Sequence, residues 1–158
     1  MFRILFSLAV AAAAFFGPWF AEPVTGTRSG AGEAVRAGDY YAGNTVACLL
    51  DGTVSLGGPC APAHGVEGLA VTAAVLLGAL SAALNVAGLL PLVGRATSLF
   101  ALAAGIAGVA ALVAVGIGVA SAPGMAMADL RWGAFATGGF GLLCAAAGLK
   151  GLGGDGED

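Results

Sequence analysis

The sequence predicts an all-α membrane protein: a four-helix transmembrane bundle with a small β-hairpin in the outer loop between the first two helices. Long uncharged segments are the first observation, because no charged residue occurs between Glu67 and Arg95 or between Arg95 and Asp129. Composition is the second: 9% of the residues are charged and 59% are hydrophobic, whereas a soluble domain carries about 25% charged residues. We therefore expect lipid to cover much of a single integral membrane domain, residues 1–158.

Four segments approach the roughly 20 apolar residues that a spanning helix needs. The first of them follows Met1-Phe2-Arg3, and this start also resembles a secretory signal peptide. The aromatic residues between Phe15 and Phe20 resemble an interfacial belt and favour an uncleaved span, with cleavage as the alternative. The predicted spans cover about residues 2–20, 68–90, 97–119 and 130–149.

Residues 22–67 have loop composition, and residues 151–158 form a polar tail. Within the loop, the stretch from Tyr40 to Leu56 is rich in aromatic and β-branched residues. Asp51-Gly52 in this stretch is a strong signal for a two-residue turn. We therefore predict the β-hairpin over residues 40–56.

Two of the cysteines, Cys48 and Cys60, lie in this loop. We expect both chain termini in the cytoplasm and the loop outside, because Arg95 lies in a very short turn between spans. On the oxidising side we expect a Cys48–Cys60 disulfide, worth about 3 kcal/mol in the chain-entropy model; two free thiols are the alternative. Cys144 is interpreted as a buried structural thiol of the last span.

Small residues recur at four-residue spacing in the predicted spans. Inside a bilayer, close backbone approach through small residues drives helix association. Packing within the bundle is the expected use of such a stripe, and contact with another subunit is the alternative. In the last span the stripe consists of Gly133, Thr137, Gly141 and Ala145.

The sequence argues against catalysis. It contains no phosphate loop, nucleophile elbow, zinc-protease motif or C-x-x-C pair, and the predicted second and third spans lack the charges typical of proton or ion pathways. We interpret Asn85 as a structural residue that hydrogen-bonds a neighbouring helix. Glu67 is interpreted as an anchor at the end of a helix, and His64 as a surface residue. His64 with Cys60 makes at most half a metal site. We expect no enzyme activity, metal or cofactor, and the lack of a basic cluster excludes nucleic acid.

The order of a short span, a loop with two cysteines and three further spans resembles the claudin-type four-span membrane proteins. The similarity runs from Asn44-Thr45-Val46-Ala47-Cys48 to Gly58-Pro59-Cys60. Gly43-Asn44-Thr45-Val46 stands where that family has Gly-Leu-Trp. The resemblance implies bonded loop cysteines and a small sheet on the outer face.

We therefore expect a non-enzymatic multi-pass protein of the cell membrane that acts through protein contacts, as a scaffold, adhesion element or accessory subunit. Its partners would be the lipid bilayer and other membrane protein subunits or further copies of itself. The expected outer recognition surface is Tyr40, Tyr41 and Leu49. The alternative is a small transporter or channel component, whose polar path would use Thr72, Ser81, Asn85, Thr97 and Thr137.

Overall fold

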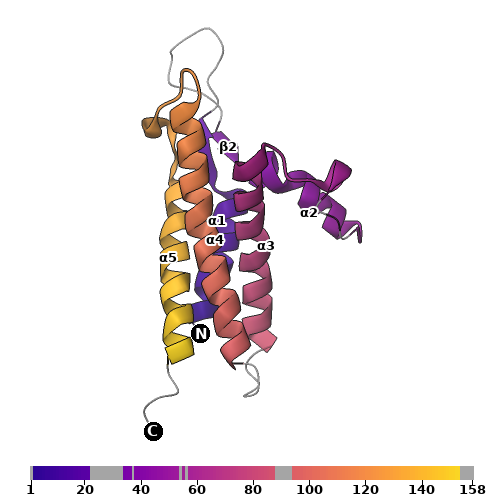
Figure 1. Cartoon of the computed structure of the whole chain (residues 1–158), viewed down its shortest axis with the longest axis vertical. Coiled ribbons are helices and arrows are strands. Elements are labelled where there is room, and N and C mark those ends of the chain that lie inside the picture. Colours follow the sequence, from indigo (N-terminus) through magenta and orange to yellow (C-terminus); the bar gives the residue numbers. More distant parts are fainter. Residues whose placement is uncertain are drawn as a thin grey trace.

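The computed structural model describes residues 2–21, 34–36, 38–53, 55, 57–87 and 94–153. Its main body is an elongated bundle of helices that run side by side (Figure 1). α4 packs along α3 and α5, and α1 packs along the same two helices from the other side. α1 begins and α5 ends at one end of the bundle, here called the termini end; the opposite end is the cap end. The helices of the bundle are α1 (Phe2–Phe16), α3 (Gly65–Ala87), α4 (Gly94–Ser121) and α5 (Trp132–Gly153).

Three helices, α3, α4 and α5, are long and apolar enough to cross a membrane. They contain 23, 28 and 22 residues, which makes each about 33–42 Å long against a hydrocarbon core of roughly 30 Å. They correspond to the second, third and fourth predicted spans, although residues 88–90 lie outside the described residues. α5 continues through Gly153, so the predicted polar tail, 151–158, begins as helix, and residues 154–158 lie outside the described part.

Small side chains, alanine above all, make up much of the interior of the bundle, and its exterior carries many large apolar ones. Ala74, Ala104 and Ala111 are fully buried, whereas Ile117 and Leu142 are each 62% exposed. Exposed apolar groups on this scale are unfavourable in water. In lipid they are favourable, and small interior residues let the helix backbones approach closely. The distribution of side chains therefore fits a bundle surrounded by hydrocarbon.

α1 is shorter than the predicted first span. It ends at Phe16 after 15 residues, because Pro18 has no backbone N–H to continue the helix. The chain then becomes extended as β1 (Pro18–Ala21), which pairs antiparallel with β2 (Ala34–Arg36). Trp19, within β1, is fully buried, and its indole N–H donates to the carbonyl of Ala13 at 3.2 Å.

The prediction of a β-hairpin over residues 40–56 is wrong for residues 40–50, and positions 54 and 56 lie outside the described residues. A π-helical turn, η1 (Gly38–Ala42), leads directly into the helix α2 (Gly43–Leu50). In the part of the chain that the structure describes, a two-stranded sheet lies elsewhere and consists of β1 and β2.

The physical reason lies in the Asp51-Gly52 dipeptide. Gly52 has a φ of 80° and donates its N–H to Leu49 O at 3.1 Å, while Thr53 N–H donates to Cys48 O at 2.8 Å. These two bonds form a Schellman cap at the end of α2. Hairpin turns and helix caps both need a glycine with positive φ, so the dipeptide alone does not distinguish them.

Candidate binding site at the cap end of the bundle

A disulfide-tied arm, formed by the described residues of 43–60, projects sideways from the bundle (Figure 1). It contains α2 and the short helix η2 (Gly58–Cys60). The predicted disulfide joins Cys48 to Cys60. Beside it, the buried Thr45 hydroxyl donates to the carbonyl of Cys60 at 2.7 Å. The arm is thus closed on itself by one covalent bond and one buried hydrogen bond.

The end of the arm brings the chain back to η1. Ala63 N–H donates to the carbonyl of Tyr41 at 3.0 Å. His64 follows with a φ of 61°, a left-handed conformation that is uncommon for residues other than glycine. Its ring stacks on Tyr40, with ring centroids 4.2 Å apart and planes 5° from parallel. The arm therefore holds His64 against η1, at the point where α3 begins.

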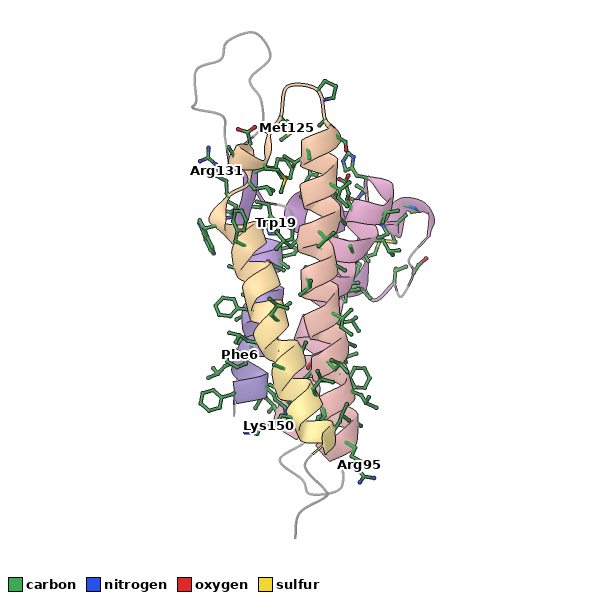
Figure 2. All side chains as sticks on the ribbon, turned by 60° about the vertical axis from the view of Figure 1, so that its left-hand side comes forward. Phe6, Trp19, Arg95, Met125, Arg131 and Lys150 are labelled. Atoms are coloured by element: carbon green, nitrogen blue, oxygen red, sulfur yellow. A yellow bond between two sulfur atoms is a disulfide. The ribbon has the colours of Figure 1, made fainter. Side chains whose placement is uncertain are left out.

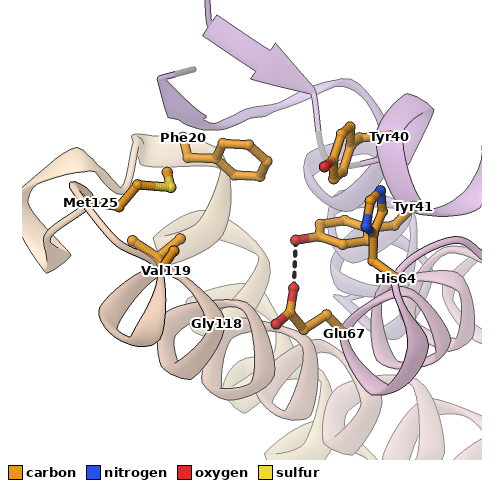
Figure 3. A pocket seen from close by; sticks show the side chains of 9 residues that line it. Phe20, Tyr40, Tyr41, His64, Glu67, Gly118, Val119 and Met125 are labelled. Carbon is orange, nitrogen blue, oxygen red and sulfur yellow. Dashed lines mark hydrogen bonds between the residues drawn. The ribbon is translucent and has the colours of Figure 1, made fainter. Parts of the chain in front are cut away.

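A cavity of about 220 Å³ opens beside these residues at the cap end (Figure 3). It lies between η1, the first turn of α3, the last turn of α4 and β1. Its lining consists of Phe20, Tyr40, Tyr41, His64, Glu67, Gly118, Val119, Ala122 and Met125.

Aromatic rings form one side of this pocket. Tyr41 stands edge-on to both Tyr40 and His64, at centroid distances of 4.9 and 5.5 Å. Phe20 of β1 stands edge-on to Tyr40 at 5.7 Å. Edge-to-face pairs at such distances are favourable because the positive ring edge meets the negative ring face. The rings therefore form one connected cluster instead of separate surface side chains.

Glu67 supplies the carboxylate of the pocket. The Tyr41 hydroxyl donates to Oε2 of Glu67 at 2.8 Å (Figure 3). Gly118 of α4 leaves room for the carboxylate, since a Cβ at that position would overlap with it. Burial raises the pKa of Tyr41 well above its usual range, and the hydrogen bond and charge of Glu67 act in the same direction. Tyr41 is therefore a neutral hydrogen-bond donor at physiological pH.

The structure places two of the three residues of the predicted recognition surface in the pocket and the third outside it. Tyr40 and Tyr41 both line the pocket, where Tyr40 is 43% exposed and Tyr41 is buried. Leu49 is half-buried on α2 and is absent from the pocket lining. Its neighbour Leu50, at the end of α2, is 83% exposed.

Sequence reasoning missed most of the pocket. Glu67 does lie in the first turn of α3, as expected, but it also faces the rings of η1. Phe20, Gly118 and Met125 reach the pocket from β1, from α4 and from the segment that follows α4. Their separation in the chain leaves no local pattern, and the Tyr40-Tyr41 pair was the one available signal.

The small-residue stripe of α5 packs inside the chain. A Cβ at Gly133 would lie 2.6 Å from the carbonyl oxygen of Pro18, and one at Gly141 would lie 2.8 Å from that of Gly105. The stripe therefore faces the end of α1 and the middle of α4. Of its members, Gly133, Thr137 and Gly141 are buried, and Ala145 is half-buried.

Polar side chains are bonded to one another inside the bundle, nearer the termini end. Ser7 of α1 bonds Ser81 of α3 at 2.8 Å and lies 3.3 Å from the Cys144 sulfur of α5. Asn85 donates to the carbonyl of Ser81 at 2.8 Å. Arg3 donates to the Ser98 hydroxyl at 2.7 Å. These contacts link all the bundle helices through hydrogen bonds.

No protein-family model, curated protein or solved structure matches this chain. Among the described residues, no group of three or more His, Cys, Asp or Glu is arranged to hold a metal ion. Fold and site together define a helical protein with three candidate membrane spans, a disulfide-tied arm and an aromatic pocket that contains one carboxylate.

Proposed function

We propose that the protein is a non-enzymatic, four-span membrane protein that acts through contacts of its arm, as a scaffold, adhesion element or accessory subunit. The arm is the observation that carries this proposal. α2 packs mainly on η1 and η2, and Leu50 at its end is 83% exposed. Because the disulfide and the Thr45 hydrogen bond close the arm on itself, it should lose less conformational entropy on binding than a flexible loop does.

The fourth span in this proposal is α1 together with β1. α1 alone measures about 22 Å, and β1 adds about 13 Å of extended chain. Extended backbone is tolerated at membrane depth where protein satisfies its hydrogen bonds. β2 and an isolated bridge from Phe20 to Leu130 supply such partners, and Arg131 N–H donates to Trp19 O at 2.6 Å. The packing of α1 along α3 and α5 also supports a place within the bundle.

We place the termini end in the cytoplasm. Arg95 and Lys150 lie at that end, and Arg131 lies at the cap end (Figure 2). Positive residues near the ends of spans favour the cytoplasmic side. The Cys48–Cys60 disulfide ties the arm, which projects from the half of the bundle nearer the cap end (Figure 1), and disulfides persist in oxidising compartments outside the cytoplasm.

Single cysteines test this topology in a Cys144→Ala background. Phe2→Cys and Lys150→Cys report on the termini end, and Pro123→Cys reports on the cap end. With a membrane-impermeant maleimide and intact cells, we expect Pro123→Cys to react and the other two to react only after permeabilisation. If Phe2→Cys reacts from the same side as Pro123→Cys, α1 does not cross the membrane.

Site-specific photocrosslinking from position 50 tests the function of the arm. We expect the crosslinked partner to co-purify with the wild type in mild detergent and to be lost from Leu50→Glu. Thr53→Glu is the matched control, because Thr53 is an exposed polar residue of the same arm. The proposal would be contradicted if the partner were recovered equally with the wild type and with Leu50→Glu. It would also be contradicted if the protein kept its biological role when the surface of the arm is altered in this way.

The alternative function, a transporter or channel component, is favoured by the polar side chains inside the bundle. Thr72, Ser81, Thr97 and Thr137 are all buried, and the Thr72 hydroxyl lacks a hydrogen-bond partner among the described residues. Reconstitution in liposomes decides between the functions. Solute flux that Asn85→Leu abolishes would favour transport, and flux that persists in this variant would refute a path through Asn85.

A further inference from the structure

The pocket at the cap end has walls suited to a cation with an apolar surface. The rings of Phe20, Tyr40 and Tyr41 line it, and the faces of such rings carry the negative end of the ring quadrupole. A cation held over the face of such a ring is attracted by this quadrupole, and one face of Tyr40 is covered by the stacked His64 ring. Tyr40 is 43% exposed and His64 is exposed, so the ring cluster is reachable from the solvent.

The charges around the pocket have the same sign. Glu67 contributes a carboxylate, and Gly118 and Val119 belong to the last turn of α4, where the helix dipole places partial negative charge. Among the described residues, the lining contains no Lys or Arg, and the neutral Tyr41 hydroxyl is the donor to the carboxylate. Within the described lining, no Lys or Arg therefore faces the carboxylate of Glu67, and His64 is the one side chain there that can carry a positive charge.

The volume of the cavity and the chemistry of its lining limit the class of ligand that it can bind. The volume of about 220 Å³ equals roughly seven water molecules at ~30 Å³ each, and lies below the ~300–1,000 Å³ of pockets for drug-sized ligands. A hard metal ion needs about six oxygen ligands, which a lining with a single carboxylate does not supply. A methylated ammonium group needs no such ligand set, because its charge is covered by apolar methyl groups.

We propose that this pocket binds a quaternary ammonium group, with its charge facing Glu67 and its methyl groups against the rings of Phe20, Tyr40 and Tyr41. This ligand class is shared by free choline-like solutes and by the choline headgroup of phospholipids. Binding at this site is independent of any partner of the arm, because Leu50 does not line the pocket.

The test is isothermal titration calorimetry of the full chain in a maltoside detergent with choline chloride. The neutral carbon isostere of choline, in which carbon replaces the nitrogen, serves as the control ligand. We expect saturable binding of choline and no measurable binding of the isostere. Glu67→Gln should weaken choline binding by at least about tenfold, because it removes the facing charge and keeps the side-chain size.

A second variant keeps the proposal testable if Glu67→Gln does not fold. Tyr40→Leu alters a partly exposed ring and should weaken choline binding by about two- to fivefold. Asp51→Asn is the matched control, because Asp51 is an exposed acid at the end of α2 outside the pocket lining. Retention of the disulfide in each variant confirms that the arm has folded.

Nanodiscs distinguish the two sources of the ligand. If a lipid headgroup occupies the site, choline binding will be lost in phosphatidylcholine nanodiscs and kept in phosphatidylglycerol nanodiscs. Equal binding in both supports a free solute. Equal affinity for choline and its isostere, absence of saturable choline binding in detergent, or unchanged choline binding in folded Glu67→Gln would overturn the proposal.

Discussion

Gly141 on α5 faces Gly105 on α4 so closely that a Cβ at position 141 would lie 2.8 Å from the Gly105 carbonyl oxygen. Real Cβ atoms essentially never approach backbone oxygen to this distance. The two helices are therefore in backbone contact at this point. Such contact is how helices associate in lipid, where burial of apolar surface contributes little.

Gly141→Ala should consequently destabilise the bundle by about 1–3 kcal/mol, because the backbone of α4 must move to admit the methyl group. Gly139→Ala is a matched control on the same helix, since a Cβ at position 139 meets nothing within 4 Å. That control should be neutral or stabilising by up to ~1 kcal/mol, as alanine is the better helix former. The stability of both variants is measured by following their unfolding as the mole fraction of dodecyl sulfate is raised. Equal stability of the two variants would show that α4 and α5 are not in contact here.

The Ser7–Ser81 hydrogen bond should contribute measurably to the packing of α1 on α3. A double-mutant cycle with Ser7→Ala and Ser81→Ala should give a coupling free energy of about 0.6 kcal/mol, with ~1.7 kcal/mol as the upper bound, as found for such bonds in membranes. Ser121→Ala is the control, because Ser121 is exposed and donates within its own helix to Ile117 O. A coupling energy indistinguishable from zero would mean that the bond does not persist in the membrane.

Loss of the disulfide should loosen the arm and leave the bundle intact. The Cys48–Cys60 bond spans a sequence separation of 12, and closure of such a loop stabilises by about 3 kcal/mol. In the double variant Cys48→Ser/Cys60→Ser, hydrogen exchange in α2 should accelerate by about a hundredfold, with unchanged exchange in α4 and α5.

Counting the free thiols of the wild type verifies that the Cys48–Cys60 disulfide is present before that experiment. The denatured wild type should take up one maleimide before reduction, at Cys144, and three after reduction. Three labels without reduction would contradict the disulfide.

Because of the Tyr41–Glu67 hydrogen bond, the free energy of unfolding should decrease at alkaline pH. The folded state raises the pKa of Tyr41 through burial and through Glu67, so it holds the hydroxyl proton more tightly than the unfolded chain does. The contribution is complete below the ordinary tyrosine value of 10.0 and is lost progressively above it. Stability of the wild type should therefore fall more steeply above this pH than stability of Tyr41→Phe.

Tyrosinate absorbance provides the direct readout. Tyr40→Phe leaves Tyr41 as the single tyrosine, and its ionisation should be delayed until the cap unfolds. Ionisation near the ordinary value in the folded Tyr40→Phe protein would contradict the burial of Tyr41 and its bond to Glu67.

The three long apolar helices and the disulfide could be predicted from the sequence, because each depends on a property that can be read along the chain. A run of residues without charge predicts a long apolar helix wherever it packs, as α3, α4 and α5 show. Cys48 and Cys60 were paired because both fall in the same loop, and the structure joins them. The end of α1 at Phe16 also has a local cause, namely Pro18.

The segment from Tyr40 to Leu56 shows where local signals become ambiguous. Its β-branched residues and its Asp51-Gly52 dipeptide fit a hairpin, but the structure forms η1 and α2. Tyr41 and Thr45 are four residues apart and both buried, a spacing that matches one face of a helix. Which of the two structures forms depends on what the segment packs against.

Apolar run length and the lack of charge were enough to place three long helices and a cysteine-tied loop in the chain, because lipid imposes that pattern on any span. Only the tertiary structure decided that β1, η1 and the ends of α3 and α4 meet around one cavity. Phe20, Glu67 and Gly118 belong to different elements, and their meeting depends on how closely glycine-rich helices approach one another. That distance is a property of the packed bundle, and no stretch of sequence contains it.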